Sequence, residues 1–487
     1  MAPRSENLLI LVSDEHRRDA MGCMGHPVVR TPNLDALAAR GAVFENAYAP
    51  SPICVPTRAA LATGQYVHRT GHWDSAAPYR GQPKSWMHAL RERGLTVMSF
   101  GKLHFRSSAD DNGFSREVLP MHVIHGTGWT EGLLREEEPV YAGARELAAD
   151  VGRGPSEYTA YDEAVCAAAE DWIAGSAGSA PWAAFVSFVS PHYPLRAPDE
   201  FLKLYDDIRI PAPAGRGTNG GARHPEIDHL ARFFNYDKHF TPERIIEARA
   251  AYFGLVSFMD HCVGRVLAAL EASGQTENTR ILYISDHGEM LGDHGFWTKS
   301  VMYEASVGVP MIAAGPWIEP GRRVRTPVSL VDVAATAADQ FGAEDFRSTL
   351  PGRSLWSIAN ERDDCGRTVF SEYHDGGSST ASFLVRWDDW KYIHYPGLPP
   401  QLFNLADDPD ECIDLGRSEV ARDVAARAEG SRRLHDICDP DRVNQIVFDD
   451  QRRRIAELGG LEACRAMAFG HTPAPAPSAV IATEYRE

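Results

Sequence analysis

Ser51-Pro-Ile-Cys-Val-Pro-Thr-Arg-Ala-Ala-Leu-Ala-Thr-Gly64 is the stretch around which the rest of the chain is organised. Pro56 disfavours a continuing strand and presets φ for the first turn of a helix, and Thr63-Gly64 is typical of a helix end about two turns later. Cys54 is therefore predicted to lie just before a helix N-terminus, where free amides and the helix dipole favour an anion. Arg58 adds a forked cation nearby. A nucleophile in this setting is suited to attack on a tetrahedral oxyanion.

Cys54 on its own would most simply be a small buried residue, because free cysteines are among the most buried residue types. The surrounding pattern favours another interpretation, because C-x-P-[ST]-R followed by L-x-T-G resembles the signature of the type I sulfatases of the alkaline phosphatase superfamily. The resemblance implies that a separate formylglycine-generating enzyme oxidises Cys54 to Cα-formylglycine. The hydrate of that aldehyde would then be the nucleophile.

The composition is that of an ordinary globular protein, with 487 residues, 44% apolar and 24% charged. A net charge of −18 argues against nucleic acid or an anionic membrane as the partner. We see no signal peptide at the N-terminus, and no apolar run that approaches the roughly 18 residues of a membrane span. The 8 cysteines show neither a disulfide framework nor C-x-x-C metal spacing. We therefore expect a cytoplasmic protein with reduced thiols.

Apolar runs separated by helical segments predict an α/β fold, with a large, mixed, mostly parallel sheet flanked by helices. The expected strands cover residues 7–12, 43–48, 96–100, 181–189 and 280–284, and the expected helices 31–40, 85–93, 161–174 and 242–272. Residues 105–160 read as an irregular insertion over the site, and 205–240 as a loop.

The chain is expected to divide into three parts, beginning with a catalytic domain over residues 1–365. Four short strands at 369–373, 382–386, 390–394 and 401–404, followed by a helix at 419–437, predict a small antiparallel-sheet subdomain over 366–438. Residues 439–487 include a Pro/Ala-rich tail that begins at His471 and is expected to be extended. We expect this extension to contact another subunit of a homo-oligomer.

Four of the predicted strands end in side chains of the kinds that bind ligands. They end in Asp14-Glu15, in Lys102 and His104, in His192, and in Asp286-His287. The carboxyl ends of parallel strands share one edge of the sheet, so a single shared site is predicted there. Carboxylate oxygens with one imidazole favour a Ca²⁺, Mg²⁺ or Mn²⁺ site over a thiolate zinc site. Each carboxylate taken alone could instead be a helix cap or a turn residue.

The resemblance to sulfatases extends over most of the chain. Gly101-Lys-Leu-His104 is similar to the family's G-K-x-H, Pro191-His-Tyr-Pro194 to its P-H-x-P, and Gly295-Phe-Trp-Thr-Lys299 to the segment of its active-site lysine. The resemblance implies a divalent metal bound by Asp14, Glu15, Asp286, His287 and the modified Cys54. It implies that Arg58 orients the aldehyde hydrate, and that Lys102, His104, His192 and Lys299 bind sulfate oxygens or protonate the leaving alcohol. The predicted reaction is hydrolysis of a small-molecule sulfate ester to an alcohol and inorganic sulfate.

Two metal positions depart from the pattern that many sulfatases show. Glu15 stands where they have Asp or Gln, and His287 where they have Asn. The imidazole favours Mn²⁺ somewhat over Ca²⁺. It also resembles the phosphonate monoester hydrolases, a sister group that lacks the G-K-x-H segment, so sulfate is favoured. Two alternatives stay open: a phosphonate monoester or phosphodiester hydrolase on the same scaffold, and a non-catalytic anion-binding homologue with an unmodified cysteine.

Within the family, the choline-sulfatase-like members are the most similar. The similarity lies in Arg69-Thr-Gly-His-Trp-Asp-Ser-Ala76, in Gly128-Trp129 and in Lys391-Tyr-Ile-His-Tyr-Pro-Gly397. Those enzymes commonly carry Asn where Ser75 stands, so the leaving-group side is expected to differ. A quaternary ammonium would need an aromatic cage and a carboxylate, for which Trp129, Trp73 and Glu372 are candidates. The alternative is that these tryptophans are simply packed.

Overall fold

The computed structural model describes residues 6–137, 140–178, 181–215, 223–467, 472–475 and 482–486. The expectation that no signal peptide is present rests partly on residues 1–5, and part of the expected tail falls on residues 468–471 and 476–481. These residues lie outside the described part of the chain.

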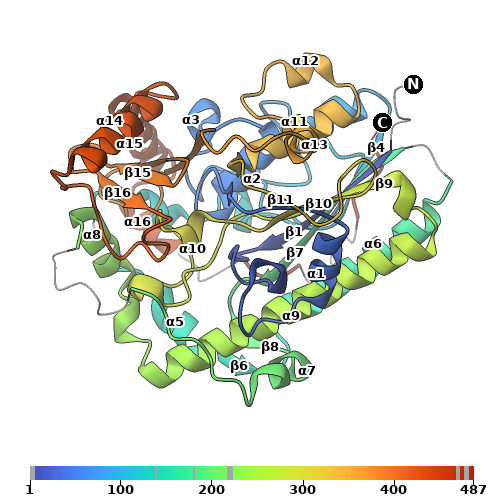
Figure 1. Ribbon diagram of the computed structural model, residues 1–487, viewed down its shortest axis with the longest axis horizontal. Helices are drawn as coiled ribbons and strands as arrows, with labels where there is room; N and C mark the ends of the chain where they lie inside the picture. Colours follow the sequence, from blue (N-terminus) through green and yellow to red (C-terminus); the bar gives the residue numbers. More distant parts are fainter. Residues whose placement is uncertain are drawn as a thin grey trace.

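An eight-stranded sheet forms the centre of the molecule, in the strand order β11-β2-β10-β9-β1-β7-β4-β5 (Figure 1). Its strands are β1 (Asn7–Asp14), β2 (Gly41–Phe44), β4 (Thr96–Lys102), β5 (Arg116–Met121), β7 (Trp182–Pro191), β9 (Thr279–Ser285), β10 (Met311–Ala314) and β11 (Arg322–Val324). Strand β10 runs antiparallel to both of its neighbours, and the other paired strands of this sheet are parallel. The predicted mixed, mostly parallel sheet is confirmed.

Both faces of the sheet are apolar, which explains why its strands read as continuous apolar runs. In β1, Leu9 and Leu11 belong to one buried cluster, and the alternate residues Leu8, Ile10 and Val12 belong to another. Helices α6 (Glu157–Gly175) and α9 (Pro242–Ala272) cover the first face. Helices α2 (Cys54–Thr63), α4 (Trp86–Arg91), α11 (Val331–Gln340) and α13 (Leu355–Asn360) contribute to the second cluster.

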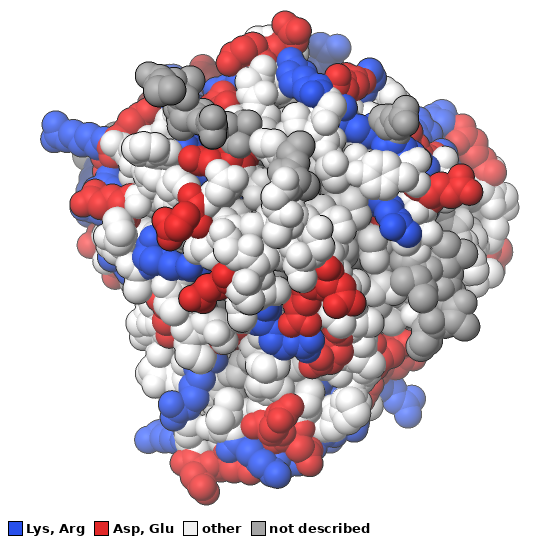
Figure 2. All heavy atoms as spheres, turned by 90° about the vertical axis from the view of Figure 1, so that its right-hand side faces the viewer, with Lys and Arg blue, Asp and Glu red and all other residues white. Residues whose placement is uncertain are grey.

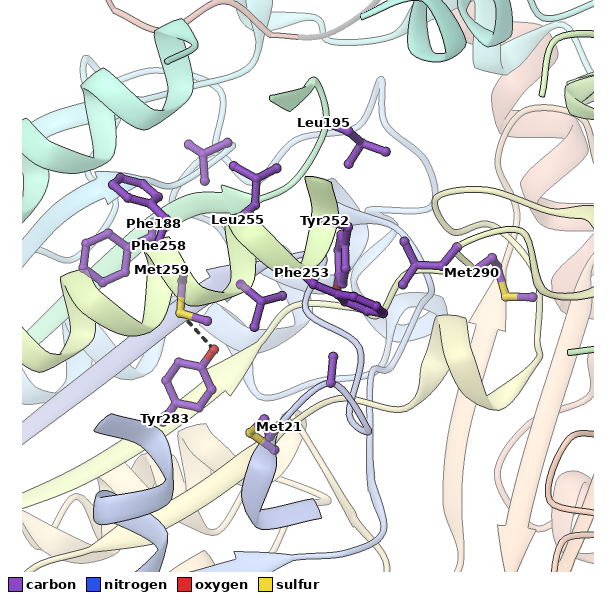
Figure 3. Packing of buried hydrophobic residues seen from close by; sticks show 14 of the residues in the cluster. Met21, Phe188, Leu195, Tyr252, Phe253, Leu255, Phe258, Met259, Tyr283 and Met290 are labelled. Carbon is purple, nitrogen blue, oxygen red and sulfur yellow. Dashed lines mark hydrogen bonds between the residues drawn. The ribbon is translucent and has the colours of Figure 1, made fainter. Parts of the chain in front are cut away.

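Helix α9 is the longest helix of the described residues and packs lengthwise under the sheet (Figure 1). Its Tyr252, Leu255 and Met259 lie in the cluster of Figure 3, where the hydroxyl of Tyr283 on β9 donates to the Met259 sulfur at 3.2 Å. An 18-residue window of α9 has a mean hydropathy of 1.4, so by length and composition it meets the criteria for a membrane span. The expectation that no run approaches that length was wrong. Of this window 67% is buried inside the protein.

Two segments that were expected to be irregular contain regular elements. Strand β5 lies within 105–160 and forms the edge of the main sheet, where it pairs with β4 alone among the named strands. Its sequence, Arg-Glu-Val-Leu-Pro-Met, mixes polar and apolar residues because only part of an edge strand is buried, so it does not read as an apolar run. Helix α8 (Pro225–Phe234) lies within 205–240, and His224 caps it just before a proline in the first helical position.

The other helices and strands that precede β13 in the chain are short. They are α1 (Pro32–Ala39), α3 (Val67–Thr70), α5 (Gly143–Ala149), α7 (Asp199–Leu202), α10 (Glu304–Val307), α12 (Glu344–Arg347), β3 (Ala47–Tyr48), β6 (Val151–Arg153), β8 (Leu195–Ala197) and β12 (Val328–Ser329). The strand expected at 43–48 is therefore split between β2 and β3, which lie in different sheets.

A second, four-stranded antiparallel sheet follows in the C-terminal part, as predicted. Its order is β13 (Val369–Tyr373), β14 (Ser382–Trp387), β15 (Trp390–His394) and β16 (Gln401–Asn404), and α14 (Ala421–His435) packs on β14 and β15. The extension then forms two unpredicted helices, α15 (Pro440–Glu457) and α16 (Leu461–Ala466). Near its far end the extension contacts β5 of the same chain, where the amide of Thr483 donates to the carbonyl of Glu117 at 2.9 Å. The domain boundaries and the contact with another subunit stay predictions.

The surface charge is mixed on the face shown in Figure 2, where Lys and Arg side chains lie among Asp and Glu side chains. Many exposed charges are locally paired, for example Arg452 with Glu136 at 2.7 Å. A surface that binds nucleic acid would instead gather one sign of charge on a face.

Candidate active site

Four strand ends meet at one edge of the main sheet, as the sequence predicts. Asp14 is the last residue of β1 and Lys102 the last of β4, while His192 and Asp286 directly follow β7 and β9. Asp14 and Asp286 are completely buried, as is His287. The parallel pairing of these strands therefore brings together groups that are far apart in the sequence.

Helix α2 presents Cys54 to this strand edge. The helix begins at Cys54 itself rather than after it, because Ile53 is the extended N-cap residue, and Gly64 ends the helix with φ of 66°. The Cys54 sulfur lies 3.0 Å from Nε2 of His287 and 3.7 Å from Oδ1 of Asp14. Burial, together with Asp14, raises the pKa of the unmodified thiol to about 12. As an unmodified thiol this group would be a weak nucleophile near neutral pH.

Arg58, one turn along the same helix, holds the two aspartates in place. Its Nε donates to Oδ2 of Asp286 at 2.8 Å, and its Nη2 donates to Oδ2 of Asp14 at 3.0 Å. Its Nη1 also donates to the carbonyl of Lys102 at 2.7 Å. The sequence predicted Arg58 beside Cys54. The structure adds that this buried guanidinium links three of the converging strands, because its partners are the last residues of β1 and β4 and the residue that follows β9.

Glu15 departs from the regular strand geometry. It has a φ of 65°, and the hydroxyl of Tyr252 on α9 donates to its carbonyl at 2.7 Å. The same hydroxyl accepts the amide of Arg17 at 3.0 Å. Left-handed backbone at a residue other than glycine persists only where its surroundings hold it. Tyr252 is therefore a support for the conformation that places the Glu15 side chain.

Replacing Tyr252 by phenylalanine tests this support. The variant leaves the buried Glu15 carbonyl and Arg17 amide without their partner, which is expected to cost about 1–3 kcal/mol in the free energy of unfolding. Divalent-metal affinity should also fall by about tenfold or more, the range for partners that orient metal ligands. Denaturant unfolding and metal titration measure the two effects, and Tyr205→Phe, on another buried hydroxyl, serves as the control for stability alone. Unchanged metal affinity would show that Tyr252 does not position Glu15.

The carboxylates and His287 form a donor set that fits a divalent cation. Ligand atoms of Asp14, Cys54, Asp286 and His287 all lie within 4.8 Å of one another. His287 directs Nδ1 to the carbonyl of Gly288 at 3.0 Å, which leaves the Nε2 lone pair facing the carboxylates. A ligand atom of Glu15 lies within 4.8 Å of those of Asp14 and His192, and Oε1 of Glu15 is buried without a hydrogen-bond partner among the described residues. A buried, unpaired carboxylate oxygen next to Asp14 is what an oxygen-preferring cation would satisfy.

Two lysines and two histidines face this donor set. The Lys102 ammonium lies 2.5 Å from Oδ2 of Asp14, and the Lys299 ammonium donates to Oε2 of Glu15 at 3.1 Å. Lys299 also lies 2.8 Å from Nε2 of His192. Burial works against the charge of Lys299, but Cys54, Glu15 and Asp14 outweigh it and raise the lysine pKa. Lys299 therefore stays a cation in this cluster.

The two histidines differ in their freedom to contact a ligand. His192 has both ring nitrogens engaged, because Nε2 faces Lys299 and Nδ1 faces the carbonyl of Tyr193 at 2.7 Å. His104 has neither nitrogen paired among the described residues, although it is buried, and its backbone has a φ of 53°. Burial lowers the pKa of both imidazoles, with nearby lysines adding to the effect. Within the described part of the chain, His104 is thus the buried ring whose nitrogens remain open to a ligand.

A cavity of about 100 Å³ opens onto these groups. Its base is formed by Cys54, Lys102, His104, His192 and Lys299. Its walls are aromatic and come from segments far apart in the chain: Trp129, Tyr141, Tyr158, Tyr193, Phe234 and Tyr236. Of these only Trp129 was predicted. The others come from the 105–160 insertion, from the residue after His192 and from the 205–240 segment, and no sequence pattern marked them.

Two predicted substrate-binding residues do not line this cavity. Trp73 packs in a separate buried cluster and donates its indole N–H to Asp450 on α15 at 3.1 Å. Glu372 is completely buried, and its carboxylate accepts from the His68 amide and contacts His374, both at 2.9 Å. The structure therefore brings neither residue to this cavity, because the Trp73 indole is packed in its own cluster and the Glu372 charge is balanced by its internal partners.

Comparison with known proteins identifies the family to which this chain is similar. Residues 6–343 match the model of the family described as Sulfatase, and residues 292–437 match the model described as N-sulphoglucosamine sulphohydrolase, C-terminal. The first match spans more than half of the chain. The second covers the junction between the main sheet and the small antiparallel sheet.

The chain is also similar to individual relatives over most of its length. It is 32% identical to a choline-sulfatase of Rhizobium meliloti, over 97% of this chain and 94% of that protein. It is 30% identical to arylsulfatase K of Danio rerio, over 88% of this chain and 85% of that protein. Among solved structures, the phosphonate monoester hydrolase of Agrobacterium radiobacter superposes with a TM-score of 0.71 at 24% identity, over 88% of this chain and 95% of that one. At this identity the last likeness shows the shared fold.

Proposed function

This chain belongs to the sulfatase family and is a sulfuric ester hydrolase, and from that premise we propose that residue 54 acts as a formylglycine nucleophile beside a divalent metal. The observation that carries the proposal is the position of Cys54. Its sulfur lies at the start of a buried helix, 3.0 Å from Nε2 of His287, at the base of a cavity that also exposes two lysines and two histidines. In the matured protein, the oxygens of the aldehyde hydrate would stand where this sulfur lies.

In the matured protein, the aldehyde hydrate of residue 54 would supply one oxygen for attack at sulfur with loss of the alcohol. Its second hydroxyl would then give up a proton to restore the aldehyde and release sulfate. The helix start favours the negative charge that develops there. Arg58 holds Asp14 and Asp286 beside residue 54, where Oδ1 of Asp14 lies 3.7 Å from the Cys54 sulfur. Charged groups that are held in place before the reaction are the condition for electrostatic stabilisation of a transition state.

We propose Asp14, Glu15, Asp286 and His287 as the protein ligands of the metal. The metal would supply Lewis-acid polarisation of a substrate oxygen and stabilise negative charge. Three carboxylates and one imidazole suit Mn²⁺ or Ca²⁺, and the nitrogen ligand favours Mn²⁺. Glu15 has a second task here, since its Oε2 accepts from Lys299 and so aims that ammonium into the cavity.

The lysines and His104 are proposed to hold the sulfate and the leaving oxygen. Lys102 and Lys299 place two ammonium groups at the cavity base, where they would balance the charge of a sulfate group. Both ring nitrogens of His104 are unpaired among the residues that the structure describes, and the ring would donate a hydrogen bond to the leaving alcohol oxygen as its bond to sulfur breaks. His192, whose ring is engaged with Lys299 and Tyr193, would instead orient Lys299.

Replacing Lys102 or His104 by alanine tests these roles. Each change is expected to lower turnover of an alkyl sulfate by about tenfold to a thousandfold, the range for losing one oxyanion contact or one general acid. The loss at His104 should be smaller for an aryl sulfate, because an activated phenol leaves with less help. Steady-state rates on paired alkyl and aryl sulfates measure both effects.

Rates on a sulfate ester and on a phosphodiester with the same leaving group decide between sulfate and phosphodiester chemistry. The fold is shared with a phosphonate monoester hydrolase, so the scaffold alone permits either reaction. We expect the matured protein to prefer a sulfate ester to a phosphodiester with the same leaving group. Tolerance of alanine at both Lys102 and His104 on an alkyl sulfate, with faster phosphodiester turnover, would favour the phosphodiesterase alternative.

A further inference from the structure

Ser75 lines the cavity, and its hydroxyl donates its proton in a hydrogen bond to a buried carboxylate. Its Oγ donates to Oδ2 of Asp375 at 2.6 Å, and its amide donates to the same oxygen at 2.7 Å. Asp375 is completely buried in the loop after β13, so the small C-terminal sheet reaches into the site. The other oxygen, Oδ1, accepts the amide of Gly376 at 2.8 Å. Both oxygens therefore receive a backbone donor, as suits an ionised carboxylate.

This geometry fixes the hydrogen-bonding character of Ser75. A serine hydroxyl has one proton to donate and two lone pairs that accept. Because the proton is directed to Asp375, only the lone pairs remain for the cavity, which Ser75 lines. The base of the cavity, in contrast, offers the donors of Lys102 and Lys299. The cavity thus pairs a donor-rich base, suited to the sulfate, with an acceptor on its wall.

The loop after β13, which carries Asp375, also positions Trp129 on the cavity wall. The Trp129 amide donates to the Ser75 carbonyl at 3.2 Å, which ties the tryptophan backbone to Ser75. A Cβ added at Gly376 would lie 2.5 Å from Cη2 of Trp129, so the indole packs directly on the backbone that follows Asp375. Any larger residue at 376 would displace the ring. Ser75 and Trp129 are therefore positioned together by residues 375–376.

We propose that Ser75, oriented by Asp375, is a specificity-determining residue that accepts a hydrogen bond from an O–H or N–H group on the leaving alcohol. The substrates would then be sulfate esters of polyols or amino alcohols, whose apolar faces lie against Trp129. This inference rests on the proposed function for the identity of the reaction. The recognition step itself is a binding event and can be measured without turnover. Asp375 acts through Ser75 and is a positioning residue.

The test compares two sulfate esters of nearly equal size, 2-aminoethyl sulfate and propyl sulfate. The first carries N–H donors where the second carries a methyl group. Ser75→Ala is expected to lower kcat/KM for 2-aminoethyl sulfate by about tenfold or more, since hydrogen bonds to charged groups are worth about 1.5–3 kcal/mol and tenfold corresponds to about 1.4 kcal/mol. The change for propyl sulfate should stay within about twofold. The assay pH should lie above the pKa of Asp375, which burial and Asp74 raise to about 7.

Binding to the Cys54→Ala protein separates recognition from catalysis. There Ser75→Ala should weaken calorimetric binding of 2-aminoethyl sulfate by the same factor and leave propyl sulfate unchanged. Ser99→Ala removes a buried hydroxyl from β4 that does not line the cavity, so it should preserve the wild-type ratio. In a double-mutant cycle, Asp375→Ala should lower the preference for 2-aminoethyl sulfate in the presence of Ser75 and have no further effect on it in Ser75→Ala.

Three outcomes distinguish the inference from the proposed function. Equal losses on both esters in Ser75→Ala would overturn the specificity role while sulfate hydrolysis stands. An equal loss on choline sulfate, a cation without N–H donors, would show that charge is recognised and would overturn the donor assignment. Selective weakening of 2-aminoethyl sulfate binding in a protein that hydrolyses no sulfate ester would support the recognition and reject the proposed reaction.

Discussion

Cys54→Ala and Cys54→Ser are each expected to lower sulfate-ester turnover by more than about a thousandfold, because both remove the only residue proposed to form the nucleophile. Serine keeps an oxygen at the position, but by the family resemblance only the cysteine is matured to an aldehyde here. The Cys54 side chain is small and its helix is held by neighbouring packing, so unfolding midpoints should change little. Rates on one alkyl sulfate and denaturant unfolding are the two measurements.

A matched control for Cys54 is Cys464→Ala, which removes another buried free cysteine at a position that does not line the cavity. This variant should retain activity close to that of the unaltered protein. Near-normal turnover in Cys54→Ala would remove residue 54 from the mechanism and leave the metal ligands alone to account for hydrolysis.

Asp286→Asn is expected to lower divalent-metal affinity by more than about a hundredfold and to lower turnover with it. The substitution keeps the shape of the side chain but removes a negative charge that faces His287 and pairs with Arg58 at 2.8 Å. The cation's charge is then less well balanced. Arg58 keeps Asp14 as a partner, so the free energy of unfolding should fall by about 1–3 kcal/mol rather than collapse. Elemental analysis, turnover and denaturant unfolding measure the three effects.

Asp332→Asn is the control for the loss of a buried ion pair. Asp332 is also completely buried and pairs with an arginine, Arg367, at 2.7 Å, but it lies at the start of α11 and does not belong to the cluster of ligand atoms around Asp286. Its variant should lose stability while keeping metal content and turnover. Full metal occupancy in Asp286→Asn would place Asp286 outside the coordination shell.

The central sheet and the base of the site could be predicted because each depends on local sequence. A strand buried on both faces, such as β1, needs an unbroken apolar run, and the polar residue that ends it is visible directly in the sequence. Asp14 and Asp286 were found in this way. Pro56 and Gly64 likewise bracketed α2, although the helix begins at Cys54, because an N-cap residue without a side-chain bond leaves no signal in the sequence.

The cavity wall could not be predicted because it depends on contacts between distant segments. Tyr141 and Phe234 reach the cavity from regions expected to be irregular. Edge strand β5 gave a weak pattern, whereas α8 carries apolar residues at helical spacing after a proline, a signal that was overlooked. The bond between Ser75 and Asp375 joins residues 300 positions apart. Trp73 and Glu372 were expected at the wall because their residue types suit a cation, but side-chain type does not show which way a residue points.

The most direct test of the account is the specific activity of the protein plotted against the fraction of residue 54 that peptide mass spectrometry finds as aldehyde. Preparations made with and without a formylglycine-generating enzyme would supply a range of fractions. The account predicts that sulfate-ester turnover rises in proportion to the aldehyde fraction and passes through the origin. Turnover that is independent of this fraction, or that persists where every Cys54 is an intact thiol, would contradict it.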